Sequence, residues 1–302
     1  MVIMAIDHAY LIFYQIHYDE SWNRMLPNYG STAIFFTRWI SNICAPGFAL
    51  LMGMSMVFYS VKKQQESSKN SNVFIFIKRG LILILLQQLL YLPTLIFNFN
   101  TIDKIPLFRG GVLYALGFSL IIASFFINWK YKLQIIIGFG IVVFNYFIAN
   151  TILKEASNSS IINLLFIPGV NNWVSIDYPT IPWLGITFIG LGVGRYFISN
   201  SKKLKSTFLF LGITFVIVFM VFRTLSMGDY KHTIYSNSIL NYLAVIKYPP
   251  SIAFVVLTMG ILSVLFWMIT FVKNHIILRP LLVFGKASLF FLFRTHLHVY
   301  LF

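Results

Sequence analysis

Long apolar runs separated by polar connections repeat along the whole sequence. A helix crosses a bilayer with roughly 20 predominantly apolar residues, rising about 1.5 Å per residue. The runs show no strand-like alternation over such lengths, and only helices or closed barrels cross lipid. The pattern therefore predicts an all-α, polytopic transmembrane helical bundle of about nine helices. The predicted helices occupy residues 1–14, 32–59, 73–99, 107–127, 133–153, 178–198, 207–225, 250–272 and 281–302.

The first two apolar runs form a predicted hairpin, and its first arm contains two adjacent titratable residues, Asp7 and His8. A charged group near the centre of a membrane helix costs about 2.5 to 3.5 kcal/mol on insertion scales. Such groups usually face the protein interior and take part in function. We therefore expect Asp7 and His8 to lie within the bundle. The alternative is that both lie near the end of a shortened helix and face water or a backbone carbonyl.

The composition excludes an ordinary soluble protein, because 58% of the residues are hydrophobic and only 10% are charged. Soluble domains average about 25% charged residues. The net charge of +15 would suggest a nucleic-acid partner in a soluble protein. Here the basic residues lie mostly in short connections between apolar runs, as the positive-inside rule describes. The expected partner is the lipid bilayer, and no nucleic acid is expected.

The basic residues also predict the orientation of the bundle. One set of alternate connections contains about twice as many Lys and Arg residues as the other and is predicted to be cytoplasmic. The outer set contains most of the acidic residues and the longest loops, residues 15–31, 154–177 and 226–249. Such loops are suited to binding a polar substrate. Without a long linker or a soluble segment, residues 1–302 are predicted to form a single domain.

Several polar or small residues lie within the apolar runs, and each suggests a contact inside the protein or at the membrane interface. Arg38 either extends to the membrane interface or forms an anion site or an ion pair with Asp7. Gln87 and Gln88 are expected to face the bundle, since buried amides need partners. A glycine-rich face in residues 177–195 is explained better by tight helix packing than by phosphate binding, because no strand precedes it.

Two basic positions are candidates for substrate contacts. Arg79 follows Lys78 at the predicted cytoplasmic start of a helix, where it is either a topology signal or a ligand for a phosphate of a cytoplasmic donor. Lys247 precedes two prolines just ahead of another helix, so it either belongs to an ordinary helix start or points toward a substrate. No metal site is expected, because the histidines are not spaced to converge on one ion.

Four stretches carry a resemblance to a known family. Together they resemble the bacterial membrane proteins related to the heparan-α-glucosaminide N-acetyltransferase catalytic domain, and the similarity runs over nearly the whole chain. KYPPS and PWLG are its most specific elements. The stretches are FFTRWISNICAPGFALLMGMS, DYPTIPWLGITFIGLGVGR, NYLAVIKYPPSIAFVVLTMG and VFGKASLFFLFRTHLHVY.

The resemblance implies a multi-pass acyltransferase of the bacterial cytoplasmic membrane. It would move an acetyl or similar acyl group from acyl-CoA to a sugar-like or envelope acceptor at the far face. Acetyl-CoA or another acyl-CoA would be a co-substrate, and no permanently bound cofactor is expected. A homodimer is one option for the assembly.

The resemblance places His8 at the histidine or asparagine position of the family's first helix, and our hypothesis assigns the following roles. His8 would be the general base or a transient acyl carrier, and Asp7 and Arg38 would provide its electrostatic surroundings. Lys247 would lie near the acceptor, Arg79 near the donor, and Trp183 of the PWLG element would contact substrate.

Two features of the family pattern differ in this sequence. Its usual Arg, Asp, Arg, Gly pattern does not precede the histidine position, and its final histidine motif is offset by one residue. The first and last helices are therefore expected to be incomplete.

Two other functions use the same features. A transporter or flippase for a polar or lipid-linked solute also needs buried polar residues and Pro or Gly breaks in its helices. The sequence shows no clear internal repeat, which counts mildly against an inverted-repeat transporter. A degenerate, non-catalytic family member is the third alternative.

Overall fold

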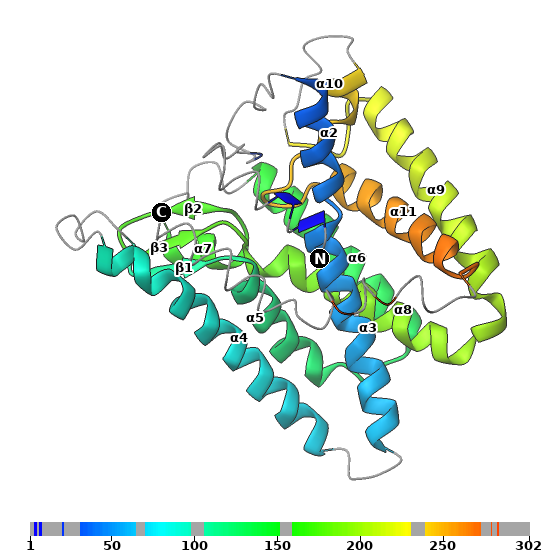
Figure 1. The fold of residues 1–302 in the computed structure, drawn as a ribbon, viewed down its shortest axis with the longest axis horizontal. Coiled ribbons are helices and arrows are strands. Elements are labelled where there is room, and N and C mark those ends of the chain that lie inside the picture. The colour runs from blue at the N-terminus through cyan, green and yellow to red at the C-terminus, as the bar shows by residue number, and fades with distance from the viewer. Residues whose placement is uncertain are drawn as a thin grey trace.

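The computed structural model describes residues 3–4, 6–7, 20, 31–64, 70–97, 106–151, 159–230 and 239–272, together with residues 279 and 283 (Figure 1). The long helices of this part of the chain are α2 (Thr32–Ser41), α3 (Cys44–Gln64), α4 (Asn70–Phe97), α5 (Val112–Phe125), α6 (Tyr131–Thr151), α8 (Thr180–Ser199), α9 (Leu204–Thr224) and α11 (Ile252–Ile269). Shorter elements are α7 (Ser160–Leu165), α10 (Ile239–Leu243), a 3-10 turn at Ser201–Lys203, and strands β1 (Phe108–Gly110), β2 (Gly169–Val170) and β3 (Val174–Ile176).

The predicted all-α membrane bundle is confirmed. Within the described residues, 6 segments are long and apolar enough to span a bilayer. α5 is apolar but shorter, with 14 residues. The chain is therefore an integral membrane protein. The predicted helices at residues 1–14 and 281–302 lie almost entirely outside the described residues.

The predicted run 32–59 is two helices, because the chain turns at Asn42 and Ile43 between α2 and α3. Pro46 lies in the first turn of α3, where its missing N–H removes no helical hydrogen bond. The 21 residues of α3 extend for about 31 Å, which already matches a hydrocarbon core of about 30 Å. α2, including Arg38, therefore lies at or beyond the membrane boundary.

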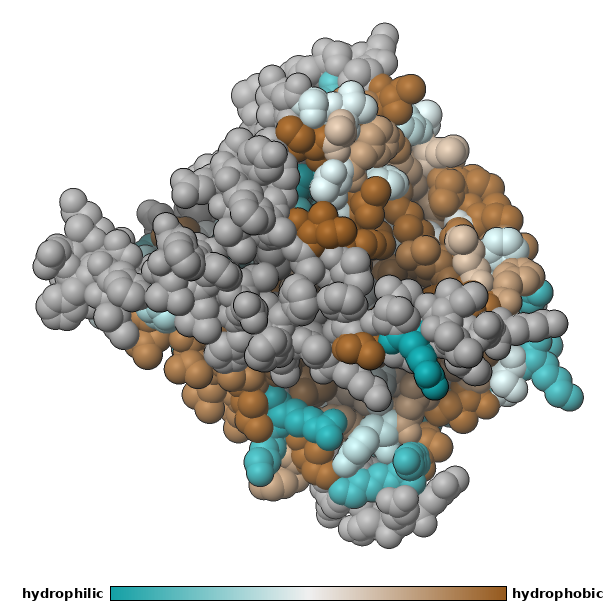
Figure 2. All heavy atoms as spheres, in the orientation of Figure 1, coloured by the Kyte–Doolittle hydropathy of each residue, from teal (hydrophilic) through white to brown (hydrophobic). Residues whose placement is uncertain are grey.

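α8 is the central helix of the bundle and packs against α3, α5 and α6, while α4 packs on α5 and α9 on α11 (Figure 1). In the span Thr180–Ser199 67% of the residues are buried, against 22% in Val73–Pro93 and 17% in Ser201–Thr224. Figure 2 shows hydrophobic side chains on the outward surfaces of α4 and α9. These two helices therefore present their apolar faces to lipid.

Glycines on two sides of α8 allow this close packing. A Cβ at Gly190 would overlap the Leu50 carbonyl oxygen of α3, and one at Gly194 would lie 2.8 Å from the Met54 Cα. On the other side, a Cβ at Gly185 would lie 2.8 Å from the Gly138 carbonyl oxygen of α6. The predicted role of the glycine-rich face in helix packing is confirmed.

We expect Gly190→Ala to destabilise the protein by about 1 to 3 kcal/mol, because the added methyl group would push α8 away from α3. Gly140→Ala in α6 is the matched control, since a Cβ there has no atom within 4 Å. Thermal unfolding of the purified variants in detergent measures both effects. Equal unfolding temperatures for the two variants would contradict the packing argument.

One end of the bundle carries the extra-membrane structure. α2, α5, α8 and α11 begin at this end, which corresponds to the predicted outer face and is called the outer end here (Figure 1). The strands form a small sheet in the order β1-β3-β2, with β1 parallel and β2 antiparallel to β3. Strands of two or three residues have no detectable sequence period, so the all-α prediction did not include them.

Two glutamines of α4 hold the chain that leads into and out of β1. The Gln88 side chain donates to the Arg109 carbonyl oxygen at 2.9 Å and accepts from the Arg109 N–H at 3.2 Å. The Gln87 side chain accepts from the Leu113 N–H at 3.3 Å. The prediction that both amides face the protein is confirmed.

Candidate functional site

Arg38 is the central charged residue of the outer end. It projects from α2 and is 8% exposed. Its guanidinium donates to the Asp7 carboxylate at 2.7 Å and to the Glu20 carboxylate at 3.3 Å. The predicted ion pair with Asp7 is thus present, and Glu20 is a second partner. The two carboxylates lie beside one cation, which compensates one of their two negative charges.

Lys247 lies next to this charged group. Its backbone N–H donates to the Glu20 carbonyl oxygen at 3.3 Å, and the residue is 5% exposed. Its ammonium lies over the Tyr248 ring, 5.2 Å from the centroid. No ion pair found in the described part of the chain includes Lys247. The ammonium is therefore able to pair with an anionic group of a bound molecule.

Three aromatic side chains pack beside Lys247. The Tyr178 ring contacts the rings of Trp183 and Tyr248, each with a centroid separation of 5.1 Å. The two phenol oxygens lie 3.0 Å apart and share a hydrogen bond. Burial raises the pKa of both the Tyr178 and the Tyr248 phenols above the ordinary value. Both phenols therefore stay neutral at pH 7 and act as hydrogen-bond donors rather than as bases.

Trp183 is 1% exposed, and its indole N–H has no hydrogen-bond partner among the described residues. Buried indole N–H groups usually have a partner. An oxygen atom of a bound substrate would satisfy this donor, which agrees with the substrate-binding role predicted for Trp183.

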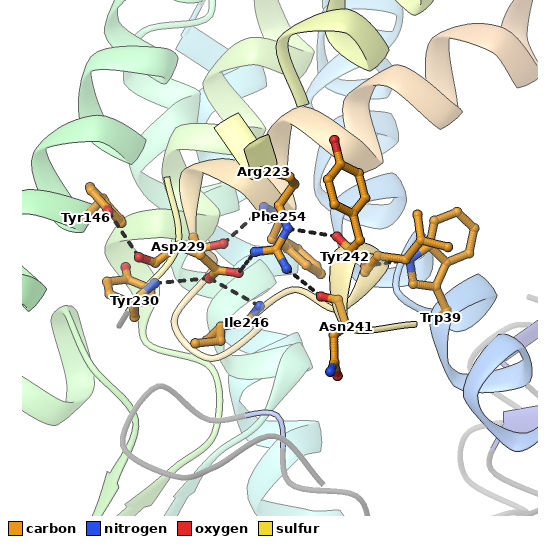
Figure 3. Close-up of polar contacts among 11 residues, drawn as sticks. Trp39, Tyr146, Arg223, Asp229, Tyr230, Asn241, Tyr242, Ile246 and Phe254 are labelled. Atoms are coloured by element: carbon orange, nitrogen blue, oxygen red, sulfur yellow. Dashed lines mark hydrogen bonds and ion pairs between the residues drawn. The ribbon is translucent and has the colours of Figure 1, made fainter. Parts of the chain in front are cut away.

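A second buried ion pair joins Arg223 at the end of α9 to Asp229, whose carboxylate accepts from the Ile246 N–H (Figure 3). The two charged groups are 3.4 Å apart, and their side chains are 2% and 4% exposed. Burial raises the pKa of Asp229 to about 7, although Arg223 acts in the opposite direction. The pair is therefore fully charged only above neutral pH.

Of the six residues that the sequence singled out, Asp7 and Arg38 form an ion pair, and Lys247 contacts Glu20, the second partner of Arg38. Trp183 is connected to Lys247 through the contacting rings of Tyr178 and Tyr248. His8 lies outside the described residues, so its predicted role stays a prediction. Arg79 lies elsewhere, with its guanidinium 5.0 Å from the centroid of the Tyr59 ring. It is exposed in the third turn of α4 and not at the predicted start of the helix, because α4 begins at Asn70. Along α4 it is about 27 Å from the outer end.

The sequence prediction missed Glu20, Tyr178 and Tyr248. A signal for Glu20 was the scarcity of acidic residues, since the chain has only 8 of them. In such a chain each carboxylate near an apolar run is a candidate partner for a buried cation. The two tyrosines each precede a proline in the most distinctive stretches, DYPT and KYPP.

The described residues contain no group of three or more His, Cys, Asp or Glu side chains that could hold a metal ion. The chemistry that this arrangement supports is acid–base and hydrogen-bonding chemistry. It combines two carboxylates that share one guanidinium, the Lys247 ammonium, which has no ion pair within the described residues, and several hydrogen-bond donors at a membrane boundary.

Comparison with known proteins identifies one family. A family model described as heparan-alpha-glucosaminide N-acetyltransferase, catalytic, matches residues 3–227, which is most of the chain. The match includes Asp7, Arg38 and Trp183, and it ends before Asp229 and Lys247. No curated protein and no solved structure matches the chain.

Proposed function

The chain belongs to the heparan-alpha-glucosaminide N-acetyltransferase catalytic family, and from this premise we propose that it moves an acetyl or similar acyl group from acyl-CoA to an acceptor at the outer face of the membrane. The acceptor would be a sugar-like or envelope molecule with a free amine or hydroxyl. The observation that carries the proposal is the buried Asp7–Arg38–Glu20 group next to Lys247 and Trp183, in a chain of this family.

The proposed reaction breaks the thioester C–S bond of acyl-CoA and forms a C–N or C–O bond to the acceptor. The acceptor loses one proton, and the CoA sulfur gains one, so free CoA is released. A general base must take the acceptor proton, and a neutral imidazole suits this step near pH 7. His8, next to Asp7 in the chain, is the proposed base.

The ion pair of Asp7 supports a neutral His8. An uncompensated carboxylate near an imidazole favours its charged form, which is unable to accept a proton. Because Arg38 lies 2.7 Å from the Asp7 carboxylate, that effect is reduced. Arg38 would therefore keep the proposed base available for catalysis.

The remaining residues are proposed to hold the substrates. Lys247 and Trp183 would bind polar groups of the acceptor at the outer end. Arg79 would bind a phosphate of the acyl-CoA donor at the cytoplasmic end. With Arg79 about 27 Å from the outer end along α4, the donor would need an extended conformation across the membrane.

Mass spectrometry of the purified protein incubated with acetyl-CoA and glucosamine tests this function. We expect release of free CoA together with N-acetylglucosamine, or a histidine adduct as an intermediate. Movement of a solute across proteoliposome membranes without CoA release would instead support the transporter alternative. The absence of both CoA release and solute movement would support the non-catalytic alternative.

A further inference from the structure

Arg223 binds the chain segment that precedes Lys247. It lies in the last turn of α9, and its guanidinium Nε donates to the Tyr242 carbonyl oxygen at 2.8 Å. One terminal nitrogen donates to the Asn241 carbonyl oxygen at 2.6 Å, and the other lies 3.4 Å from Asp229 (Figure 3). All three sides of the guanidinium thus have a partner, two of them main-chain atoms of α10.

Asp229 binds the same segment closer to Lys247. Its carboxylate accepts from the main-chain N–H of Ile246 at 3.4 Å and from that of Tyr230 at 3.1 Å (Figure 3). The Ser251 hydroxyl also donates to this carboxylate, and Ser251 is the N-cap of α11. Arg223 and Asp229 together therefore fix residues 241–251 from both sides of Lys247.

The same segment is also held by a hydrogen bond from α2, the helix that contains Arg38. The Trp39 indole N–H donates to the Leu243 carbonyl oxygen at 3.0 Å, and Trp39 is the neighbour of Arg38 in α2. Residues 241–251 thus connect the Arg223–Asp229 pair with the helix that contains the Arg38 ion pairs. A shift of this segment would move Lys247 relative to Arg38 and Trp183.

We propose that Arg223 and Asp229 are positioning residues, which act on the acceptor through Lys247 and the Tyr248 ring beneath its ammonium. This inference rests on the proposed function, because it assigns Lys247 to the acceptor. The pair does not touch substrate. Its role is to hold the main chain of residues 241–251 so that the Lys247 ammonium stays in place when the acceptor arrives.

The test compares Arg223→Met with the double variant Arg223→Met/Asp229→Asn at pH 8, where the wild-type pair is charged. The single variant leaves a buried carboxylate without its partner, so it should unfold at a lower temperature. The double variant contains no unpaired charge and should regain most of the thermal stability. It still lacks the donors to the Asn241 and Tyr242 carbonyl oxygens, so the KM for glucosamine should remain raised by about tenfold or more.

Arg195→Met is the matched control. The Arg195 guanidinium also donates to a main-chain carbonyl oxygen, that of Ile127, but about 18 Å along α8 from Trp183. This variant should lose stability without a change in the KM for glucosamine. Recovery of the wild-type KM in the double variant would overturn the positioning role, and so would an equal rise of KM in Arg195→Met.

A readout that needs no turnover separates this inference from the proposed function. The Lys247 amine is buried, so it should react slowly with acetic anhydride in the wild type, as measured by mass spectrometry of the labelled peptide. The double variant should react several-fold faster at Lys247, and Arg195→Met should match the wild type. Unchanged reactivity in the double variant would overturn the inference even if acyl transfer is observed. Faster reactivity in the double variant would support the role of Arg223 and Asp229 in holding Lys247 in place, even if acyl transfer is not observed.

Discussion

His8→Ala is expected to lower the rate of acyl transfer by a factor of about 10² to 10⁴, the range that a positioned general base usually contributes. The reason is that no other neutral base is predicted beside Asp7 in the first run of the sequence. Transfer of label from acetyl-CoA to glucosamine in proteoliposomes measures the effect. His275→Ala is the control, since His275 lies in a predicted loop and has no histidine four residues away in the sequence. Undiminished turnover in His8→Ala would remove His8 from the mechanism.

Arg38→Met is expected to destabilise the protein by about 3 to 5 kcal/mol, because it removes the guanidinium that pairs with the buried carboxylates of Asp7 and Glu20. The side chains of Asp7 and Glu20 are only 15% and 2% exposed. Thermal unfolding in detergent measures the loss. Acyl transfer should fall as well, since the uncompensated Asp7 carboxylate would favour a protonated His8.

Two further variants show whether burial causes the effect of Arg38→Met. Arg109→Met removes an ion pair with Asp177 in which both side chains are more than 40% exposed, so it should cost no more than about 1 kcal/mol. Arg38→Lys keeps the charge but replaces the planar fork with a single ammonium, so it should have an intermediate effect. Equal losses for Arg38→Met and Arg109→Met would contradict the argument from burial.

The helical bundle could be predicted because each membrane span is a long apolar run. The residues at which the helices begin and end were less predictable. The break at Asn42 and Ile43 separates α2 from α3 inside one continuous apolar segment of 32 residues. Hydrophobicity alone does not report such a turn, since both helices bury apolar residues. The three short strands were missed because two or three residues show no period, and because β1 pairs with β3, which is far away in the sequence.

The site was predictable where a charge is conspicuous in an apolar run. Asp7 and Arg38 could be matched because both are charged residues in predicted apolar runs, and the structure confirms their ion pair. Glu20 belongs to a predicted loop, and the scarcity of acidic residues marks it only as a candidate partner for some buried cation. The fold is needed to place it beside Arg38. The Arg223–Asp229 pair was likewise hidden, since Arg223 at a helix end reads as a topology signal.

The most direct test of the acyltransferase account is the stoichiometry of transfer by the wild-type protein in proteoliposomes. Acetyl-CoA labelled in its acetyl group is supplied on one side of the membrane and glucosamine on the other. The account predicts equal amounts of free CoA and labelled N-acetylglucosamine, with the product on the side of the acceptor. Free CoA with labelled acetate instead of product, or no CoA release at all, would contradict it.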